Sequence, residues 1–182
     1  MNIPKVFPRV FVGLQNAEDK YSKTRHNAGA ILVSHYIQDK GVEFKFDKFS
    51  NSYKAVASTG NFYLPNTYMN LSGESIAKII KNEKEDTENL VIFFDDVTIP
   101  VGQYKISVKE GASSHNGIKS IIDHTGKNDF VRVRIGVGKV VDGKLLEPGP
   151  DKMSDFVLSN LNNLEISQIK SLASEILEKL QS

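Results

Sequence analysis

The 182-residue chain is predicted to fold as one α/β domain in which helices flank a twisted, mixed β-sheet. Two observations lead to this prediction. Short apolar runs typical of buried strands alternate along the chain with segments whose apolar residues recur at helical spacing, the pattern of α/β proteins. No internal repeat and no linker-like segment interrupts this order, and one domain is the usual count for this length. Residues 1–182 are therefore expected to form a single domain.

The N-terminal third is predicted to contain a buried strand, a helix and three further strands. Residues 10–14 form a short apolar run with a glycine near its end, which is typical of a buried strand. Residues 24–40 have apolar side chains at helical spacing and are followed by Gly41, a residue type common just beyond a helix. A turn at residues 59–61 and alternating side chains predict strands at residues 44–47, 53–58 and 62–64.

A helix and two strands are predicted in the middle of the chain. Isoleucines at helical spacing indicate a helix over residues 71–82, with Ser72 or Ser75 as candidate N-cap. Residues 90–94 are all apolar and predict a buried strand that ends at Asp95 and Asp96. Apolar and polar residues alternate over 104–109, which predicts a strand with one exposed face.

The C-terminal third is predicted to end in an amphipathic helix. Before it come a short helix at residues 114–123 and a strand at 131–135, in which Arg132 and Arg134 alternate with apolar residues. Residues 138–152 are rich in glycine, proline and charge and are predicted to be a loop. Apolar residues at helical spacing predict the last helix over residues 166–180.

The composition excludes several classes of site. Without cysteine the chain has no disulfide, iron–sulfur cluster or thiol nucleophile, and a reducing compartment is favoured. No apolar run has membrane-spanning length, and residues 1–9 lack the apolar region of a secretory signal. The cytoplasm is the expected location, with the mitochondrion as the alternative. No membrane partner is expected.

The distribution of charge has two readings. The formal net charge is only +1, yet residues 103–144 hold eight basic and four acidic residues. Such a segment suits a phosphate backbone, although a solvated protein face accounts for it equally simply. Charge alone favours the solvated face.

Polar side chains recur where an α/β sheet builds its sites, beyond the carboxyl ends of strands. Asn16 follows the first predicted strand, Asn70 follows the fourth, and Asp95 ends the strand at 90–94. His26 lies just before a helix, and Asn116 lies at the start of another. Each has a simpler reading: a lone histidine is more often a capping or core residue, and aspartate and asparagine are common in turns.

Several catalytic motifs are absent from the sequence. It contains no GxGxxG or GxxxxGK[ST] phosphate loop, no HExxH metal motif and no GxSxG nucleophile elbow. No metal and no cofactor is therefore expected. What remains is a histidine, a carboxylate and several asparagines, a set that suits ester hydrolysis by a water molecule that the histidine activates.

Taken in order, these motifs resemble the bacterial-type peptidyl-tRNA hydrolase family. The resemblance covers residues 9 to about 160, so it extends over nearly the whole chain. The family's TRHNxG motif is intact at Thr24–Gly29, while its other motifs are matched in part. The partial matches lie at residues 13–18, 68–73, 94–100, 113–118 and 132–138.

The resemblance implies a reaction and a catalytic pair. Family members cleave the ester between a peptide and tRNA, which recycles tRNA from aborted translation. His26 would be the base that activates water, and Asp95 would orient it. The residues implied to contact the substrate are Asn16, Tyr21, Tyr68, Met69, Asn70 and Asn116.

The resemblance also implies a partner. The substrate would be peptidyl-tRNA, bound through its acceptor stem and 3′ end, and the protein would be a monomer. Arg134 falls on the family arginine that clamps the tRNA 5′-phosphate. The companion lysine of that clamp falls on Ser107, and Lys105 or Lys109 could replace it.

The sequence departs from the family pattern at three places near the site. Gln15 and Ala17 replace the residues that usually flank the first asparagine, and Phe94 replaces the histidine before Asp95. Residues 112–114 replace part of a glycine-rich stretch. Two other functions remain open: an RNA-binding protein without catalysis, which would lose the polar site residues, and a small-molecule esterase, which would not need Arg134.

Overall fold

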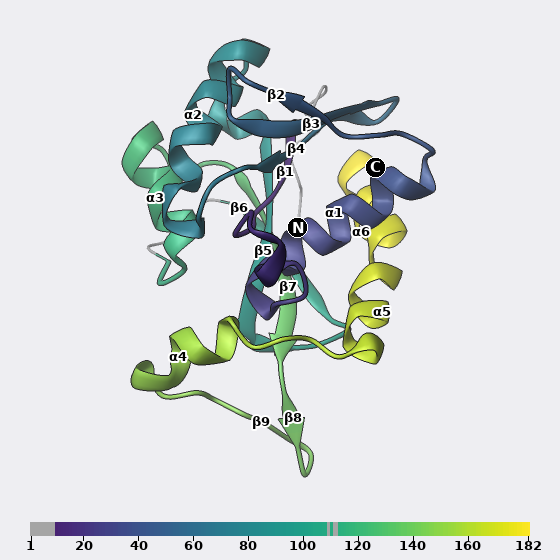
Figure 1. The fold of residues 1–182 in the computed structure, drawn as a ribbon, viewed down its shortest axis with the longest axis vertical. Helices are drawn as coiled ribbons and strands as arrows, with labels where there is room; N and C mark the ends of the chain where they lie inside the picture. The colour runs from purple at the N-terminus through teal and green to yellow at the C-terminus, as the bar shows by residue number, and fades with distance from the viewer. Residues whose placement is uncertain (1–9, 109, 111–112) are drawn as a thin grey trace.

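The computed structural model describes residues 10–108, 110 and 113–182, and it has a seven-stranded sheet at its centre (Figure 1). The strand order is β2-β3-β4-β1-β5-β7-β6. The four central strands are parallel, whereas β2, β3 and β6 run antiparallel to their neighbours. The predicted mixed α/β sheet is confirmed. The strands are β1 (Val10–Gly13), β2 (Lys45–Asp47), β3 (Ser52–Ala57), β4 (Gly60–Pro65), β5 (Leu90–Pro100), β6 (Tyr104–Val108) and β7 (Val131–Gly138).

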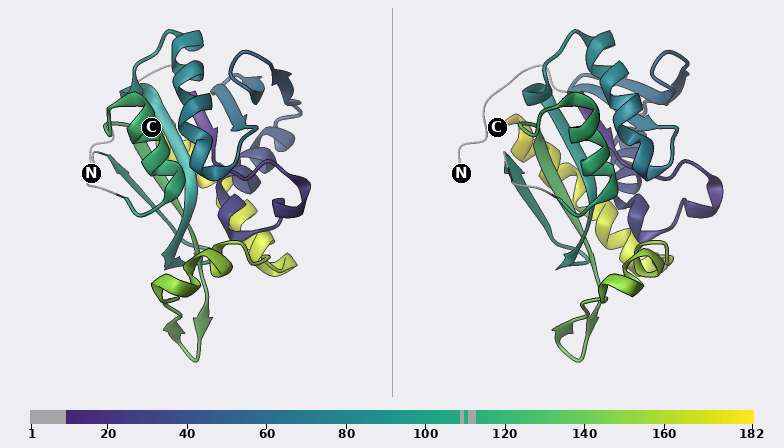
Figure 2. Two further views of the ribbon diagram at one scale, coloured as in Figure 1. Left: turned by 60° about the vertical axis from the view of Figure 1, so that its left-hand side comes forward. Right: turned by 90° about the vertical axis from the view of Figure 1, so that its left-hand side faces the viewer.

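Helices cover both faces of the sheet (Figures 1 and 2). The helices are α1 (Ala28–Asp39), α2 (Ser72–Glu83), α3 (Asn116–Thr125), α4 (Pro150–Val157), α5 (Asn163–Ser171) and α6 (Ala173–Gln181). Helices α1, α5 and α6 pack on one face, and α2 and α3 pack on the other. No helix in the described part of the chain is both long and apolar enough to span a membrane.

The two hydrophobic cores explain why the central strands are apolar throughout. Phe11 and Phe93 belong to the core beneath α1 and α6, while Val12 and Ile92 belong to the core beneath α2 and α3. Successive side chains of a strand point to opposite faces, so a strand covered on both sides buries every residue.

The structure corrects the predicted start of the first helix and the predicted N-cap of α2. The helix predicted at 24–40 begins at Ala28, after a 3-10 turn, η2 (Arg25–Asn27). The predicted serine caps of α2 are wrong, because Leu71 is its N-cap residue. The Ser72 hydroxyl donates to the Met69 carbonyl, and the Ser75 hydroxyl donates to the Ser50 carbonyl.

Other boundaries also differ. Strand β5 does not end at Asp95 but continues to Pro100, because pairing with β7 extends beyond the apolar run. The loop predicted over 138–152 contains a hairpin, β8 (Val140–Val141) and β9 (Lys144–Leu145), and the first turn of α4. The hairpin extends from the body of the domain (Figures 1 and 2). The last helix is two helices, which meet at Leu172.

A glycine lets α1 approach the sheet closely. A Cβ atom added at Gly29 would lie 2.1 Å from the Phe93 carbonyl oxygen, a main-chain atom of β5. Because His26 lies just before α1, the same approach fixes the distance between His26 and the end of β5.

Replacing Gly29 with alanine is therefore expected to lower the free energy of unfolding by about 1–3 kcal/mol or more, the usual cost of overpacking against atoms that cannot move aside. Urea unfolding of the purified variant measures this. Gly149→Ala is the matched control, since nothing lies within 4 Å of a Cβ there. Equal stability of the two variants would show that the close approach is not needed.

Candidate active site

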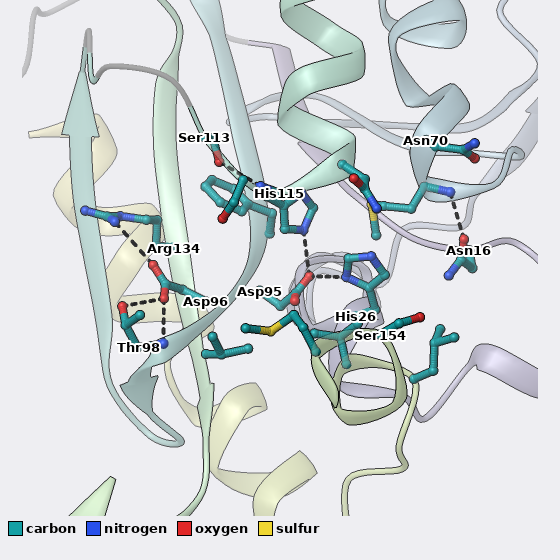
Figure 3. A pocket seen from close by; sticks show the side chains of 18 of the residues that line it. Asn16, His26, Asn70, Asp95, Asp96, Thr98, Ser113, His115, Arg134 and Ser154 are labelled. Atoms are coloured by element: carbon teal, nitrogen blue, oxygen red, sulfur yellow. Dashed lines mark hydrogen bonds and ion pairs between the residues drawn. The ribbon is translucent and has the colours of Figure 1, made fainter. Parts of the chain in front are cut away.

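Three side chains from separate elements meet at one end of the central strands (Figure 3). Strand β5 supplies Asp95, the turn η2 supplies His26, and His115 lies at the N-cap of α3. The Oδ1 atom of Asp95 lies 2.7 Å from Nδ1 of His26 and 2.8 Å from Nε2 of His115. The predicted pairing of His26 with Asp95 thus has the geometry of a hydrogen bond, and His115 is a residue that the sequence analysis did not assign to the site.

The hydrogen bonds indicate which nitrogen atom of each ring carries a proton. Nδ1 of His115 accepts bonds from the backbone N–H groups of Gly117 and Ile118, at 3.1 and 3.4 Å, so it has no proton. Nε2 of His115 then donates to Asp95. His26 donates to the same carboxylate through Nδ1, which leaves the lone pair of its Nε2 available. Nε2 has no hydrogen-bond partner among the described residues, and His26 lines a cleft.

The environment keeps Asp95 ionised. Only 4% of the residue is exposed, and burial raises the pKa of its carboxyl group. The electrostatic interactions and hydrogen bonds with His115 and His26, whose N–H groups point at the carboxylate, lower it more, so that the pKa falls from 3.8 to about 2. Asp95 is therefore a carboxylate at every pH at which the protein is expected to work.

The same three side chains also have the arrangement of a metal site. Among the described residues, His26, Asp95 and His115 each offer a ligand atom, and these atoms lie within 4.8 Å of one another. Two hydrogen bonds to one carboxylate oxygen account for this grouping.

Two asparagines organise the loop after β1. The side chain of Asn27 forms two hydrogen bonds with the main chain of Asn16. It accepts from the Asn16 N–H at 2.9 Å and donates to the Asn16 carbonyl at 3.0 Å. The Oδ1 atom of Asn16 in turn accepts from the Met69 N–H at 2.7 Å. Asn16 therefore joins the loop after β1 to the turn η3 (Met69–Leu71). The sequence analysis gave Asn27 no role. Its place within the intact motif Thr24–Gly29 is the feature of the sequence that could have indicated one.

A cleft of about 1270 Å³ leads away from His26 and Asp95. The structure brings seven of the predicted substrate residues to its walls, and Figure 3 labels three of them. Those seven are Asn16, Tyr21, Tyr68, Met69, Asn70, Asn116 and Arg134. Lys105 does not line the cleft, and Lys109 lies outside the described residues.

Helix α4, of which only the first turn falls within the predicted loop at residues 138–152, forms a wall of the cleft. Met153, Ser154 and Val157 of α4 line the cleft. The segment after α4 binds the turn η2, since the Arg25 N–H donates to the Ser159 carbonyl at 3.0 Å. The Arg25 side chain is buried and forms a 2.9 Å ion pair with Glu165 of α5. The wall and the turn that carries His26 are therefore joined.

Charged groups gather at the far end of the cleft. Arg134 of β7 donates to Asp96 at 3.2 Å and to Glu110 at 2.9 Å. Lys105 lies opposite Arg134 in the antiparallel β6–β7 pair, and its Nζ is 3.7 Å from Glu110. Residues directly opposite in such a pair lie on the same face of the sheet. Ser107, two residues further along β6, lies on the same face as Lys105 but is only 4% exposed.

The mixed sheet and the histidine–carboxylate cleft at its edge define a single-domain α/β enzyme of the hydrolase type. Comparison with known proteins makes this more specific. A family model described as peptidyl-tRNA hydrolase matches residues 10–182, so the chain belongs to the peptidyl-tRNA hydrolase family. The enzyme class expected from the motifs is confirmed.

Individual relatives agree with this family. The peptidyl-tRNA hydrolase of Bacillus subtilis (strain 168) is 35% identical over 164 residues, which cover 88% of this chain and 84% of the relative. That of Thermodesulfovibrio yellowstonii is 35% identical over 175 residues, with 94% and 89% covered. The crystal structure of the Acinetobacter baumannii enzyme matches with a TM-score of 0.83 and 28% identity, over 95% of this chain and 86% of that chain.

Proposed function

We propose that the protein hydrolyses the ester bond between a peptide and tRNA, with His26 as general base and Asp95 as its partner. One observation carries the catalytic part of the proposal. The 2.7 Å hydrogen bond to Asp95 fixes the proton of His26 on Nδ1 and leaves Nε2 to accept a proton in the cleft.

The reaction needs no covalent intermediate. Nε2 of His26 removes a proton from water while the water oxygen bonds to the ester carbonyl carbon. The Asp95 carboxylate stabilises the imidazolium ion that forms. The tetrahedral intermediate then collapses, the ribose oxygen of tRNA leaves, and His26 returns the proton to it. The products are a peptide with a free carboxylate and a deacylated tRNA.

Asn16 is suited to hold the developing oxyanion or the attacking water. Its Oδ1 is occupied by the Met69 N–H, which fixes the orientation of the amide and directs Nδ2 elsewhere. That Nδ2 group has no hydrogen-bond partner within the described residues, and Asn16 lines the cleft. Asn70 and Asn116, which are more exposed, are proposed to contact the peptide or the 3′ end of tRNA.

Replacing Asn16 with aspartate tests this role. The variant keeps the acceptor for the Met69 N–H but loses the donor, so kcat is expected to fall about 10²–10³-fold, as when one oxyanion donor is removed. Asn51→Asp, remote from the cleft, is the control. If N16D retains full kcat with an intact fold, Asn16 has only a structural role.

Substrate binding is proposed to extend to the far end of the cleft. Arg134 offers a planar guanidinium group suited to the 5′-phosphate of the acceptor stem, and Lys105 adds a second positive charge on the same face. Tyr21, Tyr68 and Met69 supply apolar surface for the peptide or the terminal bases. We also propose that the protein acts on peptidyl-tRNA as a monomer. It would recycle tRNA in the cytoplasm.

The experiment that tests the proposed function is release of the peptide part from N-acetylaminoacyl-tRNA by the purified protein. Rapid release is expected, with much slower hydrolysis of a simple amino-acid ester, because binding energy from the tRNA supports the chemistry. Binding of tRNA without release would favour the noncatalytic RNA-binding alternative. Equal turnover of both substrates would favour the small-molecule esterase.

Replacing Arg134 with alanine is expected to raise KM for a 5′-phosphorylated substrate about tenfold, roughly the value of one charge-assisted contact. A minimal ester without a 5′-phosphate should be hydrolysed as by the parent protein. Steady-state kinetics on the two substrates measures the difference. An equal rise in KM for both substrates would show that Arg134 does not bind the 5′-phosphate.

A further inference from the structure

The carboxylate of Glu110 is bound to Arg134, the side chain proposed to contact the 5′-phosphate. It lies 2.9 Å from Nη2 of Arg134 and 3.7 Å from Nζ of Lys105. Glu110 also lines the cleft, on the same side as Arg134. A negatively charged group of the protein itself thus lies between the two cations that the proposed function assigns to the substrate phosphate.

The two carboxylates bound to Arg134 differ in how firmly they are held. Oδ1 of Asp96 accepts bonds from both the N–H and the hydroxyl of Thr98, at 2.8 and 2.6 Å, and the Asp96 side chain is 11% exposed. The Glu110 side chain is 30% exposed; its carboxylate pairs with Arg134 and Lys105 and also interacts electrostatically with the buried Arg132. Asp96 is therefore a fixed partner that orients the guanidinium group, whereas the Glu110 carboxylate can exchange with another anion.

The main chain of Glu110 is anchored independently of its carboxylate. Its carbonyl accepts from Nη2 of Arg132 at 3.2 Å and from the Asn128 side chain at 3.4 Å. The side chain can therefore leave Arg134 by rotation about its own bonds while the residue keeps its place.

We infer that Glu110 is an internal competitor for the 5′-phosphate and sets how strongly the enzyme binds phosphorylated RNA ends. This inference rests on the proposed phosphate contact of Arg134. A terminal phosphate carries about −1.5 to −2 charge near neutral pH and three acceptor oxygens, so it displaces a single carboxylate. The competition weakens binding of the substrate and equally of the deacylated tRNA product, which keeps the same phosphate. Glu110 thereby favours release of the product.

Binding of two short acceptor-stem RNA duplexes tests the inference, one with a 5′-phosphate and one with a 5′-hydroxyl group. Glu110→Gln is expected to bind the phosphorylated duplex about fivefold more tightly, the scale of a partly exposed ion pair, and the hydroxyl duplex unchanged. Deacylated tRNA should become a correspondingly stronger inhibitor of hydrolysis. Glu110→Ala, which cannot bond Arg134 at all, should act in the same direction.

The controls separate this inference from a general effect of charge and from the proposed function. Glu43→Gln removes an exposed acid elsewhere and should leave both affinities unchanged. Equal tightening on both duplexes, or the same gain in E43Q, would assign the effect to net charge and overturn the inference. Unchanged or weaker binding of the phosphorylated duplex by E110Q and E110A would also overturn it.

The Arg134→Ala background distinguishes the two failures. The E110Q gain should vanish there, because the cation that both anions share is gone. If R134A itself does not weaken binding of the phosphorylated duplex, the Arg134 contact of the proposed function fails, and this inference fails with it. If R134A weakens binding but E110Q has no effect, only the role of Glu110 is lost.

Discussion

Alanine in place of His26 is expected to lower kcat on N-acetylaminoacyl-tRNA about 10²–10⁴-fold, the usual contribution of a general base. The 2.7 Å bond from Nδ1 to Asp95 makes His26 the ring whose Nε2 is available, while both nitrogen atoms of His115 are engaged. Single-turnover kinetics with saturating enzyme measures the chemical step directly. Affinity for the substrate should change little, because the imidazole acts on water.

His35→Ala is the matched control for this experiment. His35 lies on α1, and its Nε2 atom is 3.3 Å from the carboxylate of Asp39 one helical turn later. Its loss should leave kcat unchanged. Retention of most of the activity in a folded His26→Ala protein would falsify the assignment of the base and direct attention to His115.

Asparagine in place of Asp95 is expected to lower kcat about 10⁴-fold, the loss typical of replacing the carboxylate behind a catalytic histidine. Both histidines contact the same oxygen of Asp95, so an asparagine oxygen could accept the same two bonds. The substitution therefore removes the negative charge with little change in geometry. The measurement is kcat over a range of pH, with Asp129→Asn, which is remote from the cleft, as control.

The same variant has a defined effect on acid stability. The pKa of Asp95 is about 2 in the folded protein and 3.8 ordinarily, so the folded state favours the ionised form. The stability from this shift is fully present above about pH 4 and is lost as the pH falls through about 2. The difference in unfolding free energy between the parent and D95N should therefore change over this window. A difference that stays constant from pH 5 to pH 2 would contradict the depressed pKa.

Sequence patterns predicted the parts of the fold that local chemistry determines. The apolar runs at Val10–Gly13 and Leu90–Phe94 are strands because helices cover both of their faces. Strand β5 continues to Pro100 because β7 offers a partner there, which the residues 95–100 themselves do not encode. Helix α4 was missed for a similar reason: its short, proline- and glycine-flanked sequence resembles a loop, and its packing is not visible in a local pattern.

In the candidate site, too, some residues could be predicted from local motifs and others depend on packing between distant segments. His26, Asp95 and Asn16 were predicted from family motifs, of which Thr24–Gly29 is intact and those around Asn16 and Asp95 are matched in part. His115 was not assigned to the site, and in the structure it caps α3. Its second bond, to Asp95, depends on how α3 packs against β5. The pairing of Glu110 with Arg134 joins residues from two segments in the same way, and their spacing in the sequence gives no indication of it.

The contacts between the segment Thr24–Asn27 and the C-terminal segment have a consequence for synthesis on the ribosome. Arg25 and Glu165 are 140 positions apart in the sequence, and Thr24 pairs with Asn160 across a similar separation. Chains emerge from the ribosome N-terminus first, and long-range contacts of this kind form late. The turn that holds His26 is thus completed only after Glu165 has been made. A copy that is unfinished at that point, itself still esterified to tRNA, lacks the contacts that hold the proposed base in place.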